Sequence, residues 1–461
     1  MKIQRLFQTL PFFLFFFLVT IPTLMLPRDM WDGTVIEYAS LIKNYSGLKT
    51  WFIEGTWYLQ YPLSVIIIEL SHMLGLPYKN TNAFISLFFM FIFLNETFYF
   101  AKHQIKLPKF SVYLAVTLAA TFPAWGNLLS SVMTFHLGCM ALGLLSVRII
   151  HYSKIQIKFL GFIGLLGAFG LQSQLLFLPI LSYIYDQSKI NTNKKYTFIF
   201  PSLLTIQIFL IALFFFIFTK NLFPPFGLYE NSYKLKADCF YCIISSSFKM
   251  SSYLLPIVIF IVFVNILSKI INHKHTKIKK VTYSYNSLWQ LLVLFVAGTL
   301  PYVFMNKFSI YWSVKDWGSR HGFLLIFPTS LFTALCCQIL VDKAKSYFIR
   351  KIVLLGGVII IVQSILLLGF SVLHKLNRQV FVTDLENLIK KIQHEIEPGL
   401  TQIIVNKIPA PQIREGYESN FLMYKATGKA NFWTRIEIEE NKIFTIPCEI
   451  RKNIAYQVQY I

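Results

Sequence analysis

Apolar stretches alternate with short polar segments along most of this chain. Most of the stretches are close to the roughly 20 residues that a helix needs to cross a bilayer. They cover about residues 8–27, 60–76, 82–101, 110–122, 127–147, 159–171, 174–185, 197–219, 251–268, 286–305, 321–341 and 352–373. This pattern predicts an all-α polytopic membrane protein. The first stretch is longer than the core of a signal peptide and lacks a small-residue cleavage site, so we expect it to be a membrane helix.

Two stretches decide how many times the chain crosses the membrane. The stretch 60–76 contains Glu69 and His72, so we expect a juxtamembrane or re-entrant helix on the outer side. The stretch 159–185 is interrupted by Gln172-Ser173-Gln174 and is expected to form two short spans. About eleven transmembrane helices result, with the N-terminus inside and about twice as many Lys and Arg in inner loops as in outer ones. If 60–76 is counted as a span and 159–185 as a single span, inner and outer loops carry about equal numbers of Lys and Arg. The positive-inside rule therefore favours the model with eleven spans.

The composition agrees with a membrane protein. The 461 residues are 55% hydrophobic and only 14% charged, whereas ordinary soluble domains carry about 25% charged residues. A net charge of +22 would suggest nucleic acid binding in a soluble protein. Lys and Arg collect in the cytoplasmic loops of membrane proteins, so we expect contacts with membrane lipids and no nucleic acid partner. Six Cys in this length do not make a disulfide framework.

Acids are scarce, at 21 Asp and Glu against 43 Lys and Arg, yet Asp29, Asp32 and Glu37 follow closely on the first apolar stretch. Carboxylates at a membrane face are costly unless they have a partner or a function. Two interpretations stay open for Asp32. It could cap a short helix that begins near Gly33. It could also act as a general base that deprotonates an acceptor hydroxyl while a phosphate group leaves.

A second polar cluster lies at the outer end of a late span and contains Lys315, Asp316, Arg320 and His321. Arg binds phosphate through a bidentate fork, and Lys binds it as a point charge. The alternative is that Arg320, with Trp317 three residues earlier, only anchors the helix at the membrane interface.

Polar residues inside the apolar stretches predict contacts between helices. They are Glu96, His136, Gln172 and Gln174. A stripe formed by Gly161, Gly164, Gly167 and Gly170 predicts a close helix contact in the same way. Cys239 and Cys242 form a lone CxxC pair without a second pair of ligands, so we expect a local disulfide or two free thiols there and assign no residue as a metal ligand.

We predict two domains. Residues 1–373 form the transmembrane domain, in which 28–81 is the first outer loop with its juxtamembrane helices. Residues 374–461 form a small extracytoplasmic α+β domain without a catalytic motif. Its helix is predicted to begin at a capping box, Thr383 to Glu386, and to end at Pro398-Gly399. Four strand-like runs follow, at 402–405, 435–439, 443–446 and 456–461.

Several short elements resemble the GT-C superfamily of membrane glycosyltransferases. These enzymes use polyprenyl-phosphate sugars and include the dolichyl-phosphate-mannose protein mannosyltransferases and the aminoarabinose lipid A transferases. The resemblance is carried by Asp32, Tyr38-Ala39, Gly47, Tyr61-Pro62-Leu63 and Leu74-Gly75, and late in the chain by Arg320-His321 and Pro328. By motif it covers the first 80 residues or so and about 315–330.

The resemblance implies an inverting transfer of a sugar from undecaprenyl or dolichyl phosphate to a glycan or lipid acceptor, on the outer face of the cytoplasmic membrane. Asp32 would be the catalytic base, with Asp29 as the second candidate. Arg320 and Lys315 would stabilise the phosphate as it regains charge. Glu37, Tyr61, Asp316 and His321 complete the expected substrate site. A divalent cation stays open as a cofactor.

Two other functions remain as alternatives. One is a transporter or flippase of lipid-linked sugars, which would usually show inverted repeats and ionisable residues at mid-membrane. The other is a polysaccharide polymerase or ligase, which tends to carry its large outer loop late in the chain. The absence of a convincing repeat and the richness of the early loop favour the glycosyltransferase.

Overall fold

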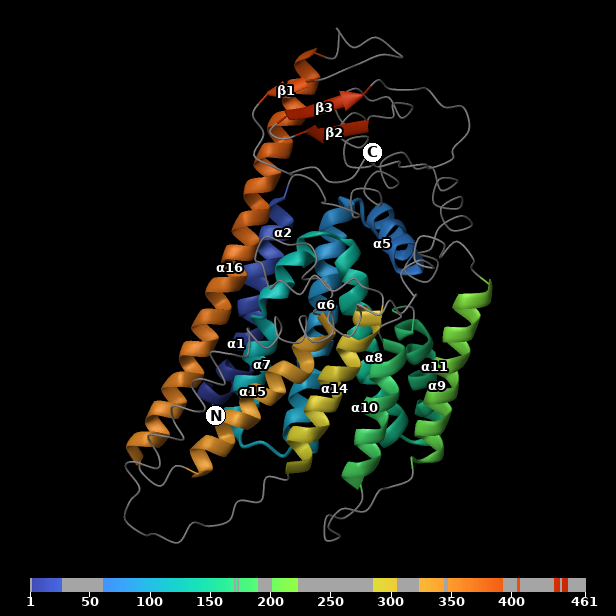
Figure 1. Cartoon of the computed structure of the whole chain (residues 1–461), viewed down its shortest axis with the longest axis vertical. Helices are drawn as coiled ribbons and strands as arrows, with labels where there is room; N and C mark the ends of the chain where they lie inside the picture. Colours follow the sequence, from blue (N-terminus) through green and yellow to red (C-terminus); the bar gives the residue numbers. More distant parts are fainter. Residues whose placement is uncertain are drawn as a thin grey trace.

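The computed structural model is mostly helical (Figure 1). It describes residues 2–26, 61–169, 171, 174–189, 201–222, 285–304, 323–343, 347–392, 404–406, 435–439 and 442–446. The first helical run consists of α1 (Lys2–Phe15), a π-helical turn η1 (Phe16–Thr20) and α2 (Ile21–Met25). The following helices are α5 (Tyr61–Leu74), α6 (Tyr78–Tyr99) with the π turn η2 (Phe100–Gln104), α7 (Lys109–Ala120), the 3₁₀ helix η3 (Pro123–Leu129), α8 (Val132–Tyr152), α9 (Ile155–Ala168), α10 (Gln174–Lys189), α11 (Leu203–Leu222), α14 (Tyr285–Phe304), α15 (Phe323–Lys343) and α16 (Tyr347–Ile392).

Within these described residues, five helices are long and apolar enough to cross a membrane. They span Tyr78–Gln104, Lys109–Leu129, Met133–Tyr152, Phe323–Asp342 and Phe348–Val380. α16 also exposes a row of large apolar side chains, among them Leu355, Ile359, Val362 and Leu366. Exposed apolar surface of this extent is costly in water and is ordinary in lipid. The helices are therefore compatible with the membrane protein that the sequence predicts.

Three pairs of side chains show that α6 and α8 pack side by side and run in the same direction. Ser86 bonds to Thr134, Glu96 to Arg148 and Gln104 to Tyr152. Residue numbers rise together along the two helices, so the helices are parallel. α7 must therefore return the chain to the end where α6 began, and η3 lies at that end between α7 and α8.

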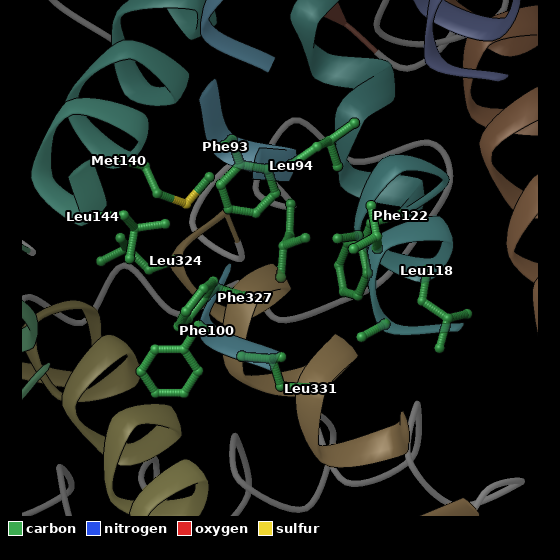
Figure 2. Close-up of a cluster of buried hydrophobic side chains, with 14 of the residues drawn as sticks. Phe93, Leu94, Phe100, Leu118, Phe122, Met140, Leu144, Leu324, Phe327 and Leu331 are labelled. Carbon is green, nitrogen blue, oxygen red and sulfur yellow. The ribbon is translucent and has the colours of Figure 1, made fainter. Parts of the chain in front are cut away.

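The core is built on two buried aromatic side chains. Trp125 of η3 contacts the rings of Phe15, Phe93 and Phe323, and its indole Nε1 donates to the Ala119 carbonyl at 2.6 Å. Phe327 of α15 contacts the rings of Phe93, Phe100 and Phe177. Figure 2 shows Phe327 between Phe93 and Phe100, with Met140, Leu144 and Leu324 nearby. These contacts join the first helix to α6, α10 and α15 around η3.

The glycine stripe packs α9 against α8, as the sequence predicts for Gly161 and Gly164. A Cβ at Gly161 would lie 2.8 Å from Ile150 and 3.1 Å from the Ser146 carbonyl, and one at Gly164 would overlap the Ser146 hydroxyl. A Cβ at Gly167 would meet no other atom within 4 Å.

This difference gives a matched pair of substitutions. Gly161→Ala should destabilise the protein by roughly 1–3 kcal/mol, because the added methyl group overpacks the α8–α9 contact. Gly167→Ala removes the same backbone freedom without a clash and should be neutral or slightly stabilising. Unfolding in detergent measures both effects, and an equal loss in the two variants would contradict the packing.

The structure corrects the predicted capping box. Thr383 lies inside α16, and its hydroxyl donates to the Gln379 carbonyl one turn earlier at 2.8 Å. A hydroxyl can bond back to its own helix in this way without ending it, so α16 continues over 46 residues to Ile392. The predicted boundary between the two domains, between residues 373 and 374, falls within this continuous helix.

Three short strands follow α16 along the chain. They are β1 (Ile404–Asn406), β2 (Arg435–Glu439) and β3 (Lys442–Ile446), and β3 pairs antiparallel with both others. They lie within two residues of three predicted runs. The fourth predicted strand, 456–461, and the predicted helix end at Pro398-Gly399 lie outside the described residues.

Candidate functional site

Most of the predicted site lies outside the part of the chain that the structure describes. This applies to Asp29, Asp32, Glu37, Lys315, Asp316, Arg320 and His321. Tyr61 is the first residue of α5, and only its backbone is described. The described residues nearest to these segments in sequence are the helix ends that flank them.

The helix ends that flank both predicted clusters belong to the region around η3. The early acids lie between the end of α2 and the start of α5, and α2 packs against η3. The late cluster directly precedes α15, whose first residue, Phe323, lies 4.8 Å from Trp125 of η3 (ring centroids). η3 thus adjoins one flank of each predicted cluster.

A buried polar cluster surrounds η3. Lys375 of α16 is only 1% exposed, and its ammonium group donates to the Ser371 hydroxyl at 2.8 Å. A Cβ at Gly126 would overlap the Ser371 hydroxyl and lie 3.4 Å from Lys375 Nζ. Only glycine lets η3 approach α16 this closely. We call Gly126, Asn127, Ser371, Lys375 and Arg378 the η3 cluster; Asn127 and Arg378 are also buried.

Two more buried polar residues occupy the first turns of α6, which begins at the same end of the bundle. Lys79 is 8% exposed and Asn82 is 1% exposed. With Lys375 and Arg378, the described residues at this end include three buried cationic side chains. Buried cations are stable only when anionic or carbonyl groups compensate them. Chemically, such an arrangement can bind carboxylates or phosphate.

The other end of α6 and α8 is held by a bidentate ion pair. The Arg148 guanidinium donates to both carboxylate oxygens of Glu96 at 2.7 Å and lies 4.7 Å from the centre of the Tyr99 ring. Glu96 is 2% exposed. The sequence predicts Glu96 to join two helices, and this contact bears the prediction out. Arg148 lies within α8, where it compensates the buried carboxylate.

A second polar group lies beyond this pair and joins α8, α10 and α11. His151 Nε2 lies 2.7 Å from the Ser182 hydroxyl, which lies 2.7 Å from the Thr205 hydroxyl. Thr205 donates to Asp186 Oδ2 at 2.6 Å, and Asp186 Oδ1 lies 3.4 Å from His151 Nδ1. Burial opposes the charge of Asp186, but hydrogen bonds from Thr205 and Ser202 and the nearby His151 outweigh it and lower the pKa of this carboxyl.

The connectivity of Ser182, His151 and Asp186 matches that of a hydrolase triad, but the environment does not. A nucleophilic serine must reach its substrate, and Ser182 is 0% exposed. Its hydroxyl also contacts Thr205. We therefore treat this group as structural. Among the described residues, no three His, Cys, Asp or Glu side chains are grouped as metal ligands would be.

Lys79, Lys375 and Arg378 were not identified as functional residues from the sequence. A usable signal exists for two of them, because Lys375 and Arg378 are three residues apart and so share one face of a helix. The sequence prediction ends the last span at residue 373 and so places Lys375 and Arg378 in the soluble domain. The close approach that covers Lys375 comes from Gly126 of η3, which is distant in sequence.

Comparisons with known proteins add no further constraint. No protein-family model matches the chain, no curated protein matches it, and no solved structure matches it.

Proposed function

We propose that this protein is a GT-C-like membrane glycosyltransferase that moves a sugar from a polyprenyl-phosphate carrier to a glycan or lipid acceptor on the outer face of the membrane. The observation that carries the proposal is the concentration of buried cations, Lys79, Lys375 and Arg378, at the end of the bundle where the acid-bearing segment 27–60 begins. A base and a phosphate-binding group are both needed for this reaction. The described residues at this end supply buried cations, and the segment that follows α2 in the sequence carries the candidate bases.

The proposed roles follow the chemistry of each side chain. Asp32 deprotonates the acceptor hydroxyl, with Asp29 as the alternative base. Arg320, helped by Lys315, stabilises the lipid phosphate as the sugar leaves, and Lys375 adds positive charge from α16. Glu37, Tyr61, Asp316 and His321 line the substrate site. Electrostatic stabilisation by preorganised cations is usually the largest contribution to such a reaction.

The proposal includes the finer architecture predicted from the sequence. Eleven spans in the cytoplasmic membrane, with the N-terminus inside, would put segment 27–60 and residues 315–321 on the extracytoplasmic side. A small α+β domain containing the three strands would lie on that side too. The number of Lys and Arg in the loops supports this orientation.

The alternative of a lipid-linked sugar transporter has one observation in its favour. Glu96 and Arg148 form an ion pair inside two candidate spans, and ionisable residues within spans often mark transport pathways. Here the pair compensates itself and lies at the end of the helices away from the η3 cluster. A helix contact explains it without a transport role.

Donor binding offers a direct test in which sugar transfer is measured with purified protein and a polyprenyl-phosphate sugar. Arg320→Ala should raise the donor KM roughly 10- to 100-fold, because a charged hydrogen bond to phosphate contributes about 1.5–3 kcal/mol. Lys375→Met should raise the donor KM by a smaller factor, because Lys375 is buried and its charge acts on the phosphate without direct contact. Lys351→Met is the matched control, since Lys351 is an exposed residue near the start of the same helix.

Three outcomes separate the alternatives. Raised donor KM in both variants with an unchanged control supports the proposed site. Unchanged donor KM in both variants counts against phosphate binding there. Movement of the intact lipid-linked sugar across the vesicle membrane, without transfer of the sugar to an acceptor, would contradict the glycosyltransferase and support the transporter.

A further inference from the structure

α9 and α10 form a hairpin of two short helices. They contain 14 and 16 residues, whereas a membrane crossing takes about 20. α9 runs antiparallel to α8. A Cβ at Gly161, in its first half, would lie 2.8 Å from Ile150 near the end of α8, and the Gly167 carbonyl near its own end lies 3.6 Å from Cys139 Sγ. The hairpin therefore leaves from the end of the bundle at which α8 finishes.

α10 returns the chain to that same end. Its first residue, Gln174, lies beside Gly143 of α8, and Ser182 farther along lies 2.7 Å from His151 (Oγ to Nε2). The backbone N–H of Gln174 donates to the Leu171 carbonyl at 2.8 Å in the turn between the two helices. This turn is level with the middle of α8, and Figure 1 shows α10 in the half of the bundle away from α5. The predicted pair of short spans would return the chain to the same end, so the predicted sides of the other segments are unchanged.

The side chain of Gln174 is buried in this turn without a partner. It is 0% exposed, and among the described residues neither its Oε1 nor its Nε2 has a hydrogen-bond partner. Gln338, a second buried glutamine in a candidate span, shows the ordinary arrangement. Its Oε1 accepts from Ser111 at 2.6 Å, and its Nε2 donates to Asp342 at 2.9 Å. A buried amide without partners is costly, so Gln174 points to a bound group that supplies them.

The side chains around Gln174 decide what kind of molecule can bind. A Cβ at Gly143 would lie 3.2 Å from Gln174 Oε1 and 3.0 Å from both methyl groups of Leu178, so glycine lets the carboxamide lie against α8. Met140 and Leu144 lie close to Gly143 along α8 and are apolar (Figure 2). Leu178, Met140 and Leu144 are each at most 2% exposed. A charged ligand would need a compensating charge here, and these neighbours offer none.

A small uncharged molecule fits these conditions. α10 begins at Gln174, and the first turn of a helix leaves backbone N–H groups without partners inside the helix. We propose that water binds at the start of α10, held by the Gln174 carboxamide and by these N–H groups, and that it fixes the tip of the hairpin inside the bundle. Water both donates and accepts, so it can satisfy either group of the carboxamide. Non-helical backbone at membrane depth is tolerated where protein or water supplies such partners.

Solid-state NMR of the full-length protein in lipid bilayers tests the site directly. With nitrogen-15-labelled glutamine, magnetisation from water protons should reach the Gln174 side-chain amide, and Gln174→Met assigns this signal by removing it. Gln338 is the matched control, because its carboxamide is also buried but is bonded to protein groups. Its amide should receive clearly less magnetisation from water. The proposed sugar-transfer site is not involved, so either proposal can fail without the other.

Two glycine variants separate the bound water from packing. A Cβ at Gly143 or at Gly138 would approach a neighbouring side chain to 3.0 Å, but Gly143 adjoins Gln174 and Gly138 adjoins the Phe89 ring. Gly143→Ala should displace the carboxamide and abolish the water contact of Gln174, whereas Gly138→Ala should leave that contact intact. Absence of a water contact at Gln174 in the wild type overturns the proposal, as does an equal contact at Gln174 and Gln338. A water contact that persists unchanged in Gly143→Ala overturns it too.

Discussion

Replacing Asp32 by Asn should reduce sugar transfer by roughly 10²- to 10⁴-fold, the contribution typical of a general base. The substitution keeps the size of the side chain and removes its ability to take a proton from the acceptor hydroxyl. Donor binding should change little, because the proposed mechanism assigns the lipid phosphate to the cations and not to Asp32. The measurement is the transfer rate at saturating donor and acceptor, together with the amount of protein in the membrane.

Two controls separate catalysis from folding for this variant. Glu54→Gln removes another carboxylate from the same segment, one to which the proposal assigns no role, and should leave transfer within about twofold. Asp29→Asn tests the second candidate base. Full loss in Asp29→Asn with normal transfer in Asp32→Asn would exchange their roles. Normal transfer in both would remove the early acids from the mechanism.

The sequence predicts the helical architecture well where helices are long and apolar. The stretches 82–101, 127–147 and 321–341 correspond closely to α6, α8 and α15. Such stretches are decisive because a bilayer requires every backbone group to be bonded within the helix. Helix ends are less certain, since local signals compete there. Thr383 illustrates this, because the same Ser/Thr chemistry that caps a helix also occurs within one.

The partners of buried polar residues could not be predicted in the same way. Glu96 is conspicuous in an apolar stretch, but nothing local indicates that Arg148, distant in sequence, neutralises it. Lys375 is similar, since its burial depends on Gly126 and η3. Pairing of this kind follows from the parallel packing of α6 and α8 and from the course of α16. Both are tertiary features without a short sequence pattern.

The Glu96–Arg148 pair should show the largest effect on stability among the described side chains. Removing one partner of a buried ion pair leaves an uncompensated charge and typically costs about 3–5 kcal/mol. We expect Arg148→Met to lose an amount in this range, measured by unfolding in detergent, because it leaves the 2% exposed Glu96 carboxylate uncompensated. Glu96→Leu should lose less, because the Arg148 side chain is 26% exposed. Lys390→Met is the control, since Lys390 also lies 2.7 Å from a carboxylate, that of Glu386, but is 46% exposed. It should lose less than about 1 kcal/mol.

The double variant Glu96→Leu/Arg148→Met distinguishes two roles for the ion pair. Each side chain could be needed only to neutralise the buried charge of the other, or the attraction between them could itself stabilise the fold. Apolar replacements of similar volume often restore the stability that a single removal takes away, because neither charge then has to be buried. The double variant should therefore be more stable than either single variant and lie within about 2 kcal/mol of the wild type. Losses that simply add would mean that the two side chains stabilise the protein through separate contacts. In that case α6 and α8 would be held together mainly by their apolar packing, and the ion pair would be incidental to it.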